Sequence, residues 1–338
     1  MENTWKLKLR LFLAMAILFG IIYAILMVIG TLFLGGASFQ LYAIIGIVIM
    51  IVQYLAGPKI VEISMGVKYV SEEKAPDLHR IIGDLAKIAN IPKPKVGVSE
   101  INVPNAFAFG RTKSDGRVCI TRGMLNILKE DEIRAVLGHE IAHIKHSDMI
   151  VMTVVSMIPM ICYYIGMSFI FSRGNNENNN SALIGILALG AYFIGQLLVL
   201  FISRTREYYA DQGSVEFGNS PDKLASALYK LVYGASKADK NEVKKFKGTS
   251  AFFLNDIGNT DFDIRELSQL DTDRDGNISA SELSQLKYRE IHVKTREKLM
   301  EVFSTHPNML KRMRRLSEYL DNEKNLPKKP EKNLMTHI

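Results

Sequence analysis

Cysteine is scarce in this sequence, which has two such residues, Cys119 and Cys162, among 338. Cys119 falls in a polar segment and Cys162 in an apolar one, so the two are not expected to meet. A reducing cytoplasm would keep both thiols free. This scarcity excludes a metal site built from cysteine ligands.

Charge is absent from long stretches of the chain. Residues 11–58, 149–172 and 178–203 contain no Asp, Glu, Lys or Arg. An uncharged apolar run of about 18 or more residues predicts a transmembrane helix. Buried helices of a soluble protein, or a cleaved signal peptide for the first run, are the alternatives; the length of that run and the second run directly after it argue against both. We therefore predict four spans, at residues 11–34, 41–56, 149–171 and 183–203.

Basic residues flank the predicted spans on one side only. Lys6, Lys8 and Arg10 precede the first span, and Arg204 and Arg206 follow the fourth. The short connectors GGASFQ and SRGNNENNN carry no net charge. The positive-inside rule then places both termini and both large polar segments in the cytoplasm, as in a multi-pass protein of the cell membrane. The net charge of +7 fits this bias better than it fits nucleic-acid binding, and KRMRR at 311–315 is interpreted as a solvated or lipid-facing helix surface.

A metal-binding pattern stands just before the third span. His139, Glu140 and His143 form H-E-x-x-H. Residues at i and i+4 share one face of a helix, so both imidazoles can bind one ion, and Glu140 can take a proton from metal-bound water. The alternative is a pair of ordinary histidines on a helix. The pattern predicts a zinc-dependent hydrolase.

Catalytic zinc needs a third protein ligand and an open position for water. One protease class uses H-E-x-x-H-x-x-G-x-x-H, but here His146 and Met149 occupy its last two defined positions, so that class is excluded. We interpret His146 as a surface residue or a neighbour of the ligands. Glu207 and Asp211, spaced i and i+4 after the fourth span, are better candidates: one carboxylate can bind the metal while the other accepts a hydrogen bond from a ligand imidazole. The pair resembles the E-x-x-x-D half of a glutamate-zincin site, which implies that Glu207 is the ligand. A surface carboxylate pair is the alternative.

Four motifs together resemble the HtpX-type membrane metalloproteases, which are related to the CAAX prenyl endopeptidases: VPNAFAFG (103–110), LGHEIAHIKHSD (137–148), TREYYAD (205–211) and FSTHP (303–307). The resemblance implies a mainly α membrane protein with four transmembrane helices. It also implies a cytoplasmic gluzincin-type α+β catalytic domain with a small antiparallel sheet. The implied activity is zinc-dependent cleavage of misfolded or damaged membrane proteins, with one catalytic Zn²⁺ and Glu140 as the general base.

The resemblance assigns two further elements. Residues 105–109 alternate as an edge strand, and the family's strand at this place pairs with extended substrate, which makes Asn105, Ala106 and Phe107 substrate-binding candidates. His306 stands where the family has a residue near the site, and a histidine there can donate a hydrogen bond to the oxyanion. An ordinary strand and an N-terminal helix cap are the respective alternatives.

An acidic segment between these motifs departs from the family pattern. Residues 271–282, DTDRDGNISASE, match a complete EF-hand loop, which predicts a Ca²⁺ site. We interpret residues 256–290 as an insertion; the alternative is an acidic surface loop without metal. The predicted calcium ligands are Asp271, Asp273, Asp275, Asn277, Ser279 and Glu282.

The predicted organisation divides the chain into a transmembrane hairpin, the first catalytic part, a second hairpin, the second catalytic part with its insertion, and a disordered tail: 1–58, 59–148, 149–203, 204–320 and 321–338. The expected partners are unfolded or membrane-protein substrates and the lipid bilayer. Two other functions stay open, a catalytically inactive calcium-responsive membrane scaffold and an endopeptidase for prenylated peptides.

Overall fold

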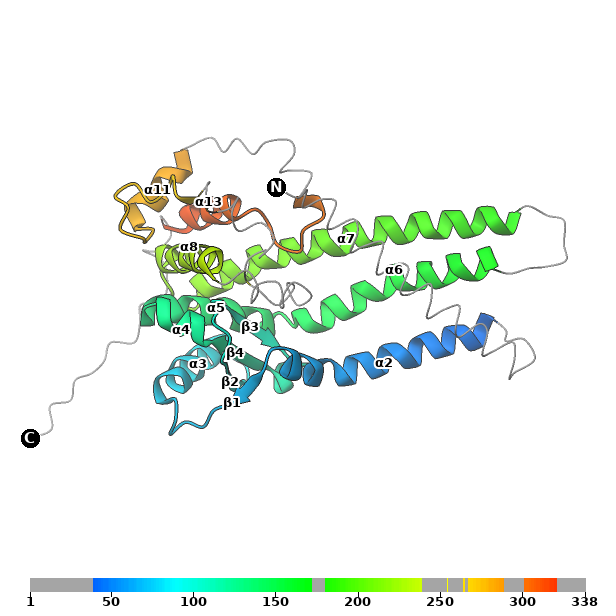
Figure 1. Ribbon diagram of the computed structural model, residues 1–338, viewed down its shortest axis with the longest axis horizontal. Helices are drawn as coiled ribbons and strands as arrows, with labels where there is room; N and C mark the ends of the chain where they lie inside the picture. The colour runs from blue at the N-terminus through cyan, green and yellow to red at the C-terminus, as the bar shows by residue number, and fades with distance from the viewer. Residues whose placement is uncertain are drawn as a thin grey trace, which may run out of the picture. The chain divides into compact units, whose positions relative to one another are not determined.

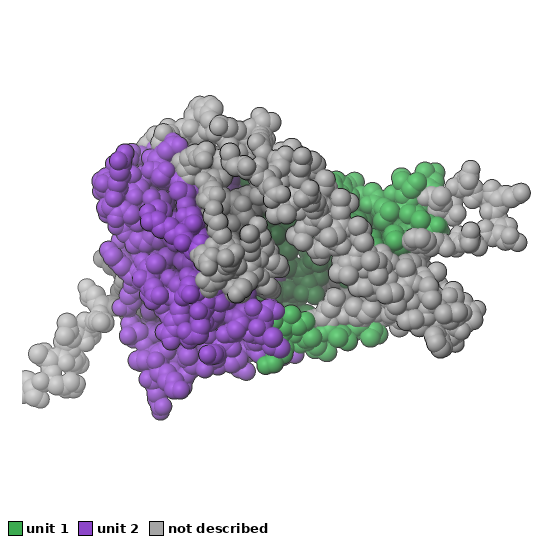
Figure 2. All heavy atoms as spheres, in the orientation of Figure 1, with its two compact units in different colours: residues 1–60, 149–204, 294–305 green, residues 61–148, 205–293, 306–338 purple. Residues whose placement is uncertain are grey.

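The computed structural model describes residues 39–171, 180–238, 254, 264, 267–288 and 301–320. The first predicted span and the predicted tail lie outside these residues. The chain divides into two compact units, shown in different colours in Figure 2. Unit 1 comprises Met1–Ile60, Met149–Arg204 and Lys294–Thr305, and unit 2 comprises Val61–Asp148, Thr205–Val293 and His306–Ile338.

Unit 1 contains most of α6 (Asp148–Phe171) and of α7 (Asn180–Glu216), which lie side by side (Figure 1). The rings of Tyr163 and Tyr192 lie with their centroids 5.3 Å apart, and Gly166 lies close to Gly185. The contact partner in α7 comes earlier as the residue in α6 comes later, so the two helices run antiparallel. A Cβ on Gly185 would lie 3.0 Å from the carbonyl oxygen of Gly166. Such small residues let two apolar helices pack closely without polar contacts.

One helix among the described residues, Gly185–Glu216 within α7, is long and apolar enough to cross a membrane. Its exposed face carries several large apolar side chains, which suits a lipid environment better than water: Ile186, Leu187, Ile194, Leu198 and Phe201. The predicted second and third spans also form helices, α2 (Phe39–Ser64) and α6. The prediction of a mainly helical chain is confirmed, with one described helix long and apolar enough to cross a membrane, and the count of four spans stays a prediction.

Unit 2 is built on a small sheet of β1 (Val67–Tyr69), β2 (Lys95–Ser99), β3 (Ala106–Phe109) and β4 (Arg117–Thr121) in the order β1-β2-β4-β3. The sheet is mixed, so the prediction of an antiparallel sheet was wrong. β1 and β3 pair antiparallel with their neighbours, but β2 and β4 are parallel. The reason is that β4 lies between β2 and β3 in the sheet. The chain reverses direction between β3 and β4, so β4 runs antiparallel to β3 and parallel to β2.

The sheet of unit 2 is contacted by α3 (Pro76–Ala89), α4 (Arg122–Ile127) and α5 (Glu130–Lys145). Beyond them, α8 (Pro221–Lys237) packs on α4 and α5, and α11 (Ala280–Tyr288) and α13 (Met309–Tyr319) pack on α8 and on each other (Figure 1). A 3-10 turn lies at Lys113–Asp115. Helix α5 carries three acidic residues in its first turn, which favourably oppose the helix dipole. The backbone N–H of Lys129 also donates to Glu132 Oε2 at 2.8 Å, so the helix start is capped.

Close packing of α5 against the last turns of α7 depends on two glycines. A Cβ on Gly213 would lie 2.6 Å from Cβ of Ala142, and one on Gly138 would lie 2.8 Å from Oγ of Ser214. Ser214 Oγ in turn donates to the carbonyl oxygen of Ala135 at 2.6 Å. These contacts bring the two helices together at the positions where the predicted metal ligands stand.

Candidate metal centre

Three predicted ligands converge in unit 2: His139 and His143 from α5, and Glu207 from α7. The two Nε2 atoms lie 3.1 Å apart, and they lie 3.5 and 3.6 Å from the nearest oxygens of Glu207. Two ligands bound to zinc at about 2.0–2.1 Å with a tetrahedral angle are about 3.3 Å apart. The spacing and chemistry of this donor set therefore fit a zinc ion with one position left open.

Carboxylates behind the imidazoles set their orientation. His139 Nδ1 lies 2.9 Å from Asp211 Oδ1, and His143 Nδ1 lies 2.5 Å from Asp148 Oδ2. A carboxylate at Nδ1 holds the proton on that nitrogen and leaves Nε2 as the free electron pair. Both Nε2 atoms accordingly face the other donors. Asp211 was predicted for this role, whereas Asp148 was not, although it stands five residues from His143.

Arg312 from α13 completes the buried charge network, and sequence reasoning missed it. Its Nη2 and Nε lie 2.6 and 2.9 Å from the two oxygens of Asp211, and its Nη1 lies 3.5 Å from Glu207 Oε2. Burial alone would lower the pKa of Arg312, but the adjacent Asp211 and Glu207 carboxylates raise it above its usual value. The interpretation of 311–315 as a solvated surface was wrong at this position, because Arg312 is fully buried. Met309 and Leu316, spaced around it on the helix, mark its face as apolar and were the signal available.

Glu140 lies beside the donors with its carboxylate buried. Burial raises the pKa of Glu140, and the neighbouring histidines and a backbone hydrogen bond oppose the rise. That bond comes from the N–H of Ala108, which donates to Oε2 at 2.6 Å. The general-base candidate is thus tied to the middle of β3.

Strand β3 is the last strand of the sheet in the described part of the chain, with β4 on one side and no described strand on the other. Asn105 faces β4: its N–H donates to Thr121 Oγ1 at 2.8 Å, and its carbonyl oxygen accepts from Thr121 N at 2.9 Å. Backbone groups alternate along a strand, so those of Phe107 also face β4, and those of Ala106 and Ala108 face the outer edge. The hydrogen bond from Ala108 N to Glu140 agrees with this register.

His306 stands next to the donors and is buried, with Nδ1 3.6 Å from Glu207 Oε2. The helix cap that was its alternative role belongs to Asn308, whose Oδ1 accepts from the N–H groups of Leu310 and Lys311. His146 is exposed and lies outside the donor group. The structure thus gathers His306, but not His146, around Glu207.

The EF-hand-like loop keeps three carboxylates together, those of Asp271, Asp273 and Asp275. Asp271 Oδ2 accepts from Gly276 N at 3.0 Å and from the hydroxyl of Tyr229 at 3.1 Å. The sharp turn needs a positive φ at Gly276, which is +79°.

The other predicted calcium ligands lie around the same turn. Asn277 N donates to Asp275 Oδ1 at 2.7 Å. Glu282 accepts from the N–H groups of Thr272 and Ser279 at 2.7 and 2.9 Å. Burial would raise the pKa of Glu282, but these bonds lower it to about 2. The carboxylate at the last position of the loop is therefore charged at neutral pH.

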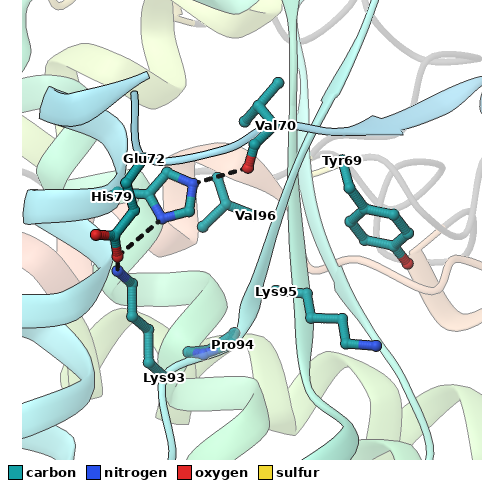
Figure 3. Close-up of a pocket in the computed structure, with 8 residues that line it drawn as sticks. All are labelled: Tyr69, Val70, Glu72, His79, Lys93, Pro94, Lys95 and Val96. Carbon is teal, nitrogen blue, oxygen red and sulfur yellow. Dashed lines mark hydrogen bonds and ion pairs between the residues drawn. The ribbon is translucent and has the colours of Figure 1, made fainter. Parts of the chain in front are cut away.

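A separate hollow of about 300 Å³ lies beside β1 and β2 (Figure 3), lined by Tyr69, Val70, Glu72, His79, Lys93, Pro94, Lys95 and Val96. His79 Nε2 lies 2.9 Å from the carbonyl oxygen of Val70, and its Nδ1 lies 3.6 Å from Glu72. Lys93 forms an ion pair with the same carboxylate. Glu72 thus contacts both His79 and Lys93, and none of the residues that line the hollow belongs to the metal centre.

Comparison with known proteins agrees with this geometry. The model of peptidase family M48 matches residues 72–320, which contain all the residues of the metal centre. A "Protease HtpX homolog" from Methanothermobacter thermautotrophicus is 63% identical over 247 residues, covering 73% of this chain and 93% of that protein. Another from Thermoplasma acidophilum is 32% identical over 318 residues, covering 90% and 92%. The crystal structure of S. mikatae Ste24p is 18% identical, with a TM-score of 0.47 over 92% of this chain and 66% of that one, a likeness too low to carry an argument.

Proposed function

This chain belongs to peptidase family M48 and is a metalloprotease, and we propose that it is a zinc endopeptidase that cleaves misfolded or unfolded membrane polypeptides at the cytoplasmic face of the membrane. The observation that carries the proposal is the convergence of His139, His143 and Glu207 beside the carboxylate of Glu140. The relationship to HtpX-type proteases predicted from the motifs is confirmed by the sequence matches.

His139, His143 and Glu207 would hold the ion, and Asp211 and Asp148 would keep the two imidazoles in the ligating tautomer. When bound, zinc supplies Lewis acidity that polarises the scissile carbonyl and acidifies a water molecule. The negative charge of Glu207 adds to the attraction for a cation. Arg312 offsets the charge of Asp211 and also lies 3.5 Å from Glu207, so Glu207 would be the negatively charged member of the ligand set.

Glu140 acts as the proton carrier in this proposal. Its carboxylate accepts the proton of the attacking water at Oε1 or Oε2 and then donates it to the nitrogen of the leaving amine. Burial raises the pKa of Glu140 above its ordinary value. The hydrogen bond from Ala108 N holds the carboxylate beside the strand on which substrate is expected to lie.

Strand β3 would bind the substrate by adding its backbone as a further strand. The outward groups of Ala106 and Ala108 are suited to this pairing, whereas Asn105 and Phe107 would position the strand through β4. His306, close to Glu207, is proposed as a hydrogen-bond donor to the oxyanion that forms on the scissile carbonyl.

The membrane arrangement we propose has four spans with both termini in the cytoplasm. The chain enters the predicted third span just after His143 and leaves the fourth just before Glu207, so both ligand groups emerge on one side. Reporter fusions after Lys8, near Asn178 and at Ile338 test it. Inside, outside and inside are the expected locations, and an outward C-terminus would overturn the arrangement.

We also propose that the loop at 271–282 binds calcium. Asp271 Oδ1 is buried and receives no hydrogen bond from any residue in the described part of the chain, and its carboxylate lies close to those of Asp273 and Asp275. A cation is the natural partner for such an oxygen. This site would stabilise the insertion, with regulation of cleavage as a further expectation.

The direct test of the proposed function combines metal analysis with a cleavage assay on the purified full-length protein. We expect one zinc per chain and hydrolysis of an unfolded casein-type substrate. Removal of the metal should abolish cleavage, and added zinc should restore it. Full cleavage by metal-free protein would contradict the proposal, whereas zinc binding without cleavage would favour the scaffold alternative. Selective cleavage of prenylated peptides would favour the third function.

A further inference from the structure

Leu254 connects two parts of the active site through its peptide groups. Its N–H donates to Asn105 Oδ1 at 3.1 Å, and its carbonyl oxygen accepts from Arg312 Nη1 at 3.0 Å. Leu254 and both of its partners are buried. A buried peptide group is costly to leave without a hydrogen bond, so each partner fixes the position of Leu254.

Each partner of Leu254 leads to a different component of the site. Asn105 directly precedes the edge strand β3, and its backbone is already fixed by two bonds to Thr121. Arg312 holds both oxygens of Asp211, which in turn lies 2.9 Å from Nδ1 of the metal-binding His139. A series of buried hydrogen bonds therefore runs from the residue before the strand to Asp211, whose carboxylate forms a close ion-pair contact with the metal-binding His139.

The distance between β3 and the metal ligands decides whether the scissile peptide bond of a substrate paired with β3 would lie at the metal. A misplacement of about 1 Å between reacting groups can cost about 10²-fold in rate. The bond from Ala108 N to Glu140 already fixes the strand near the general base. The bonds through Leu254 hold the start of the strand, at Asn105, and connect it to Asp211, the carboxylate beside His139.

We propose that Asn105 and Arg312 are positioning residues that act on opposite sides of the Leu254 peptide groups and hold β3 in register with the metal-binding His139. The substrate part of this inference rests on the proposed function. The predicted effect on zinc affinity does not rest on it, because that affinity depends on how the protein holds His139 and not on cleavage of a substrate.

Four single variants of the full-length protein test the inference. Asn105→Ala removes the acceptor for Leu254 N–H, and Asn105→Asp keeps one. Arg312→Lys keeps the charge but loses the two-pronged contact with Asp211. The matched control is Ser99→Ala, which removes another buried bond, from Ser99 Oγ to the carbonyl oxygen of Met65 at 2.6 Å, elsewhere in the sheet.

Zinc affinity, measured by competition with a chelator, is the first readout. We expect Asn105→Ala to lose about tenfold although it touches no ligand, and Arg312→Lys to lose about 10- to 100-fold. Asn105→Asp should recover most of the affinity, and Ser99→Ala should match the parent. The double variant of Asn105→Ala with Arg312→Lys should bind zinc about as well as Arg312→Lys alone, because both act through one peptide segment.

The second readout is KM for an unfolded substrate, which Asn105→Ala should raise about tenfold. The inference is overturned if Asn105→Ala behaves as Ser99→Ala in both readouts, if Asp rescues no better than Ala, or if the losses of the double variant multiply. If Arg312→Lys fails to fold, the comparison of Asn105→Ala with Asn105→Asp still tests the inference. A parent without cleavage that shows the expected zinc pattern would refute the proposed function and support the positioning inference.

Discussion

Asp148 Oδ2 lies 2.5 Å from His143 Nδ1 and 2.8 Å from Nη2 of Arg206. Burial would raise the pKa of Asp148, but the hydrogen bonds from His143 and Arg206 lower it below its ordinary value. A fully ionised carboxylate behind His143 strengthens that imidazole as a donor. The two histidine ligands thus each have a buried acid of their own, Asp148 for His143 and Asp211 for His139.

Replacing Asp148 by Asn should lower zinc affinity by about 10- to 100-fold, because the neutral amide supports His143 less strongly. Chelator competition on the purified protein measures this. Asp131→Asn is the matched control, since Asp131 is an exposed residue in the first turn of α5, the helix that carries His143, and its carboxylate lies 3.6 Å from Lys223 Nζ. Equal zinc affinities in the two variants would remove Asp148 from the metal centre.

Glu207→Ala should lose both zinc and activity, because it removes a ligand and the negative charge of the donor set. Metal content per chain is the measurement. Glu216→Ala provides the control on the same helix: Glu216 is exposed and accepts from Gln212 at 2.8 Å. If Glu207→Ala kept one zinc with the affinity of the parent, another side chain would have to be the third ligand.

His306→Phe should lower kcat by about 10²- to 10³-fold while zinc content stays the same, because an oxyanion donor acts on the transition state. Asn308→Ala separates this role from helix capping. Asn308 caps α13, so its loss should cost about 1 kcal/mol of stability and leave kcat unchanged. Equal kcat in His306→Phe and the parent would leave His306 without a catalytic role.

The parts of the site that follow a local rule could be predicted from the sequence. His139 and His143 share a face because the helix repeats every 3.6 residues, and the same rule pairs Glu207 with Asp211. Arg312 could not be placed this way, because it lies 101 residues from Asp211. A side chain that comes from a distant helix follows no spacing. Its charge also suggested a solvated position, whereas burial beside Asp211 is what gives it a role.

The fold shows the same division between local and long-range features. Long uncharged runs predicted α2, α6 and α7, because a helix satisfies its own backbone hydrogen bonds without partners. The existence of a small sheet was predicted correctly, but its antiparallel pairing was predicted wrongly, because β2 and β4 are parallel. Alternation in residues 105–109 identifies a strand and says nothing about which neighbour it pairs with. The parallel pairing of β2 and β4 follows from the order of the strands in the sheet, in which β4 lies between β2 and β3.

The double variant of Asp271→Ala with Glu282→Gln should abolish calcium binding and lower the melting temperature in the presence of calcium. The reason is that two of the four carboxylates that would surround the ion are lost. Calorimetry with calcium alone is the measurement, since a chelator would also remove zinc. No heat of binding in the parent would end the calcium proposal. Binding in the parent with equal cleavage rates in both proteins would leave a structural site.

Glu140→Gln tests the central claim most directly, because it removes the proposed proton acceptor and leaves every metal ligand in place. Zinc content and cleavage of an unfolded substrate are measured together on the parent and the variant. The account predicts one zinc per chain in both proteins and no detectable hydrolysis by the variant. Hydrolysis by Glu140→Gln at a rate near that of the parent, with zinc still bound, would contradict it.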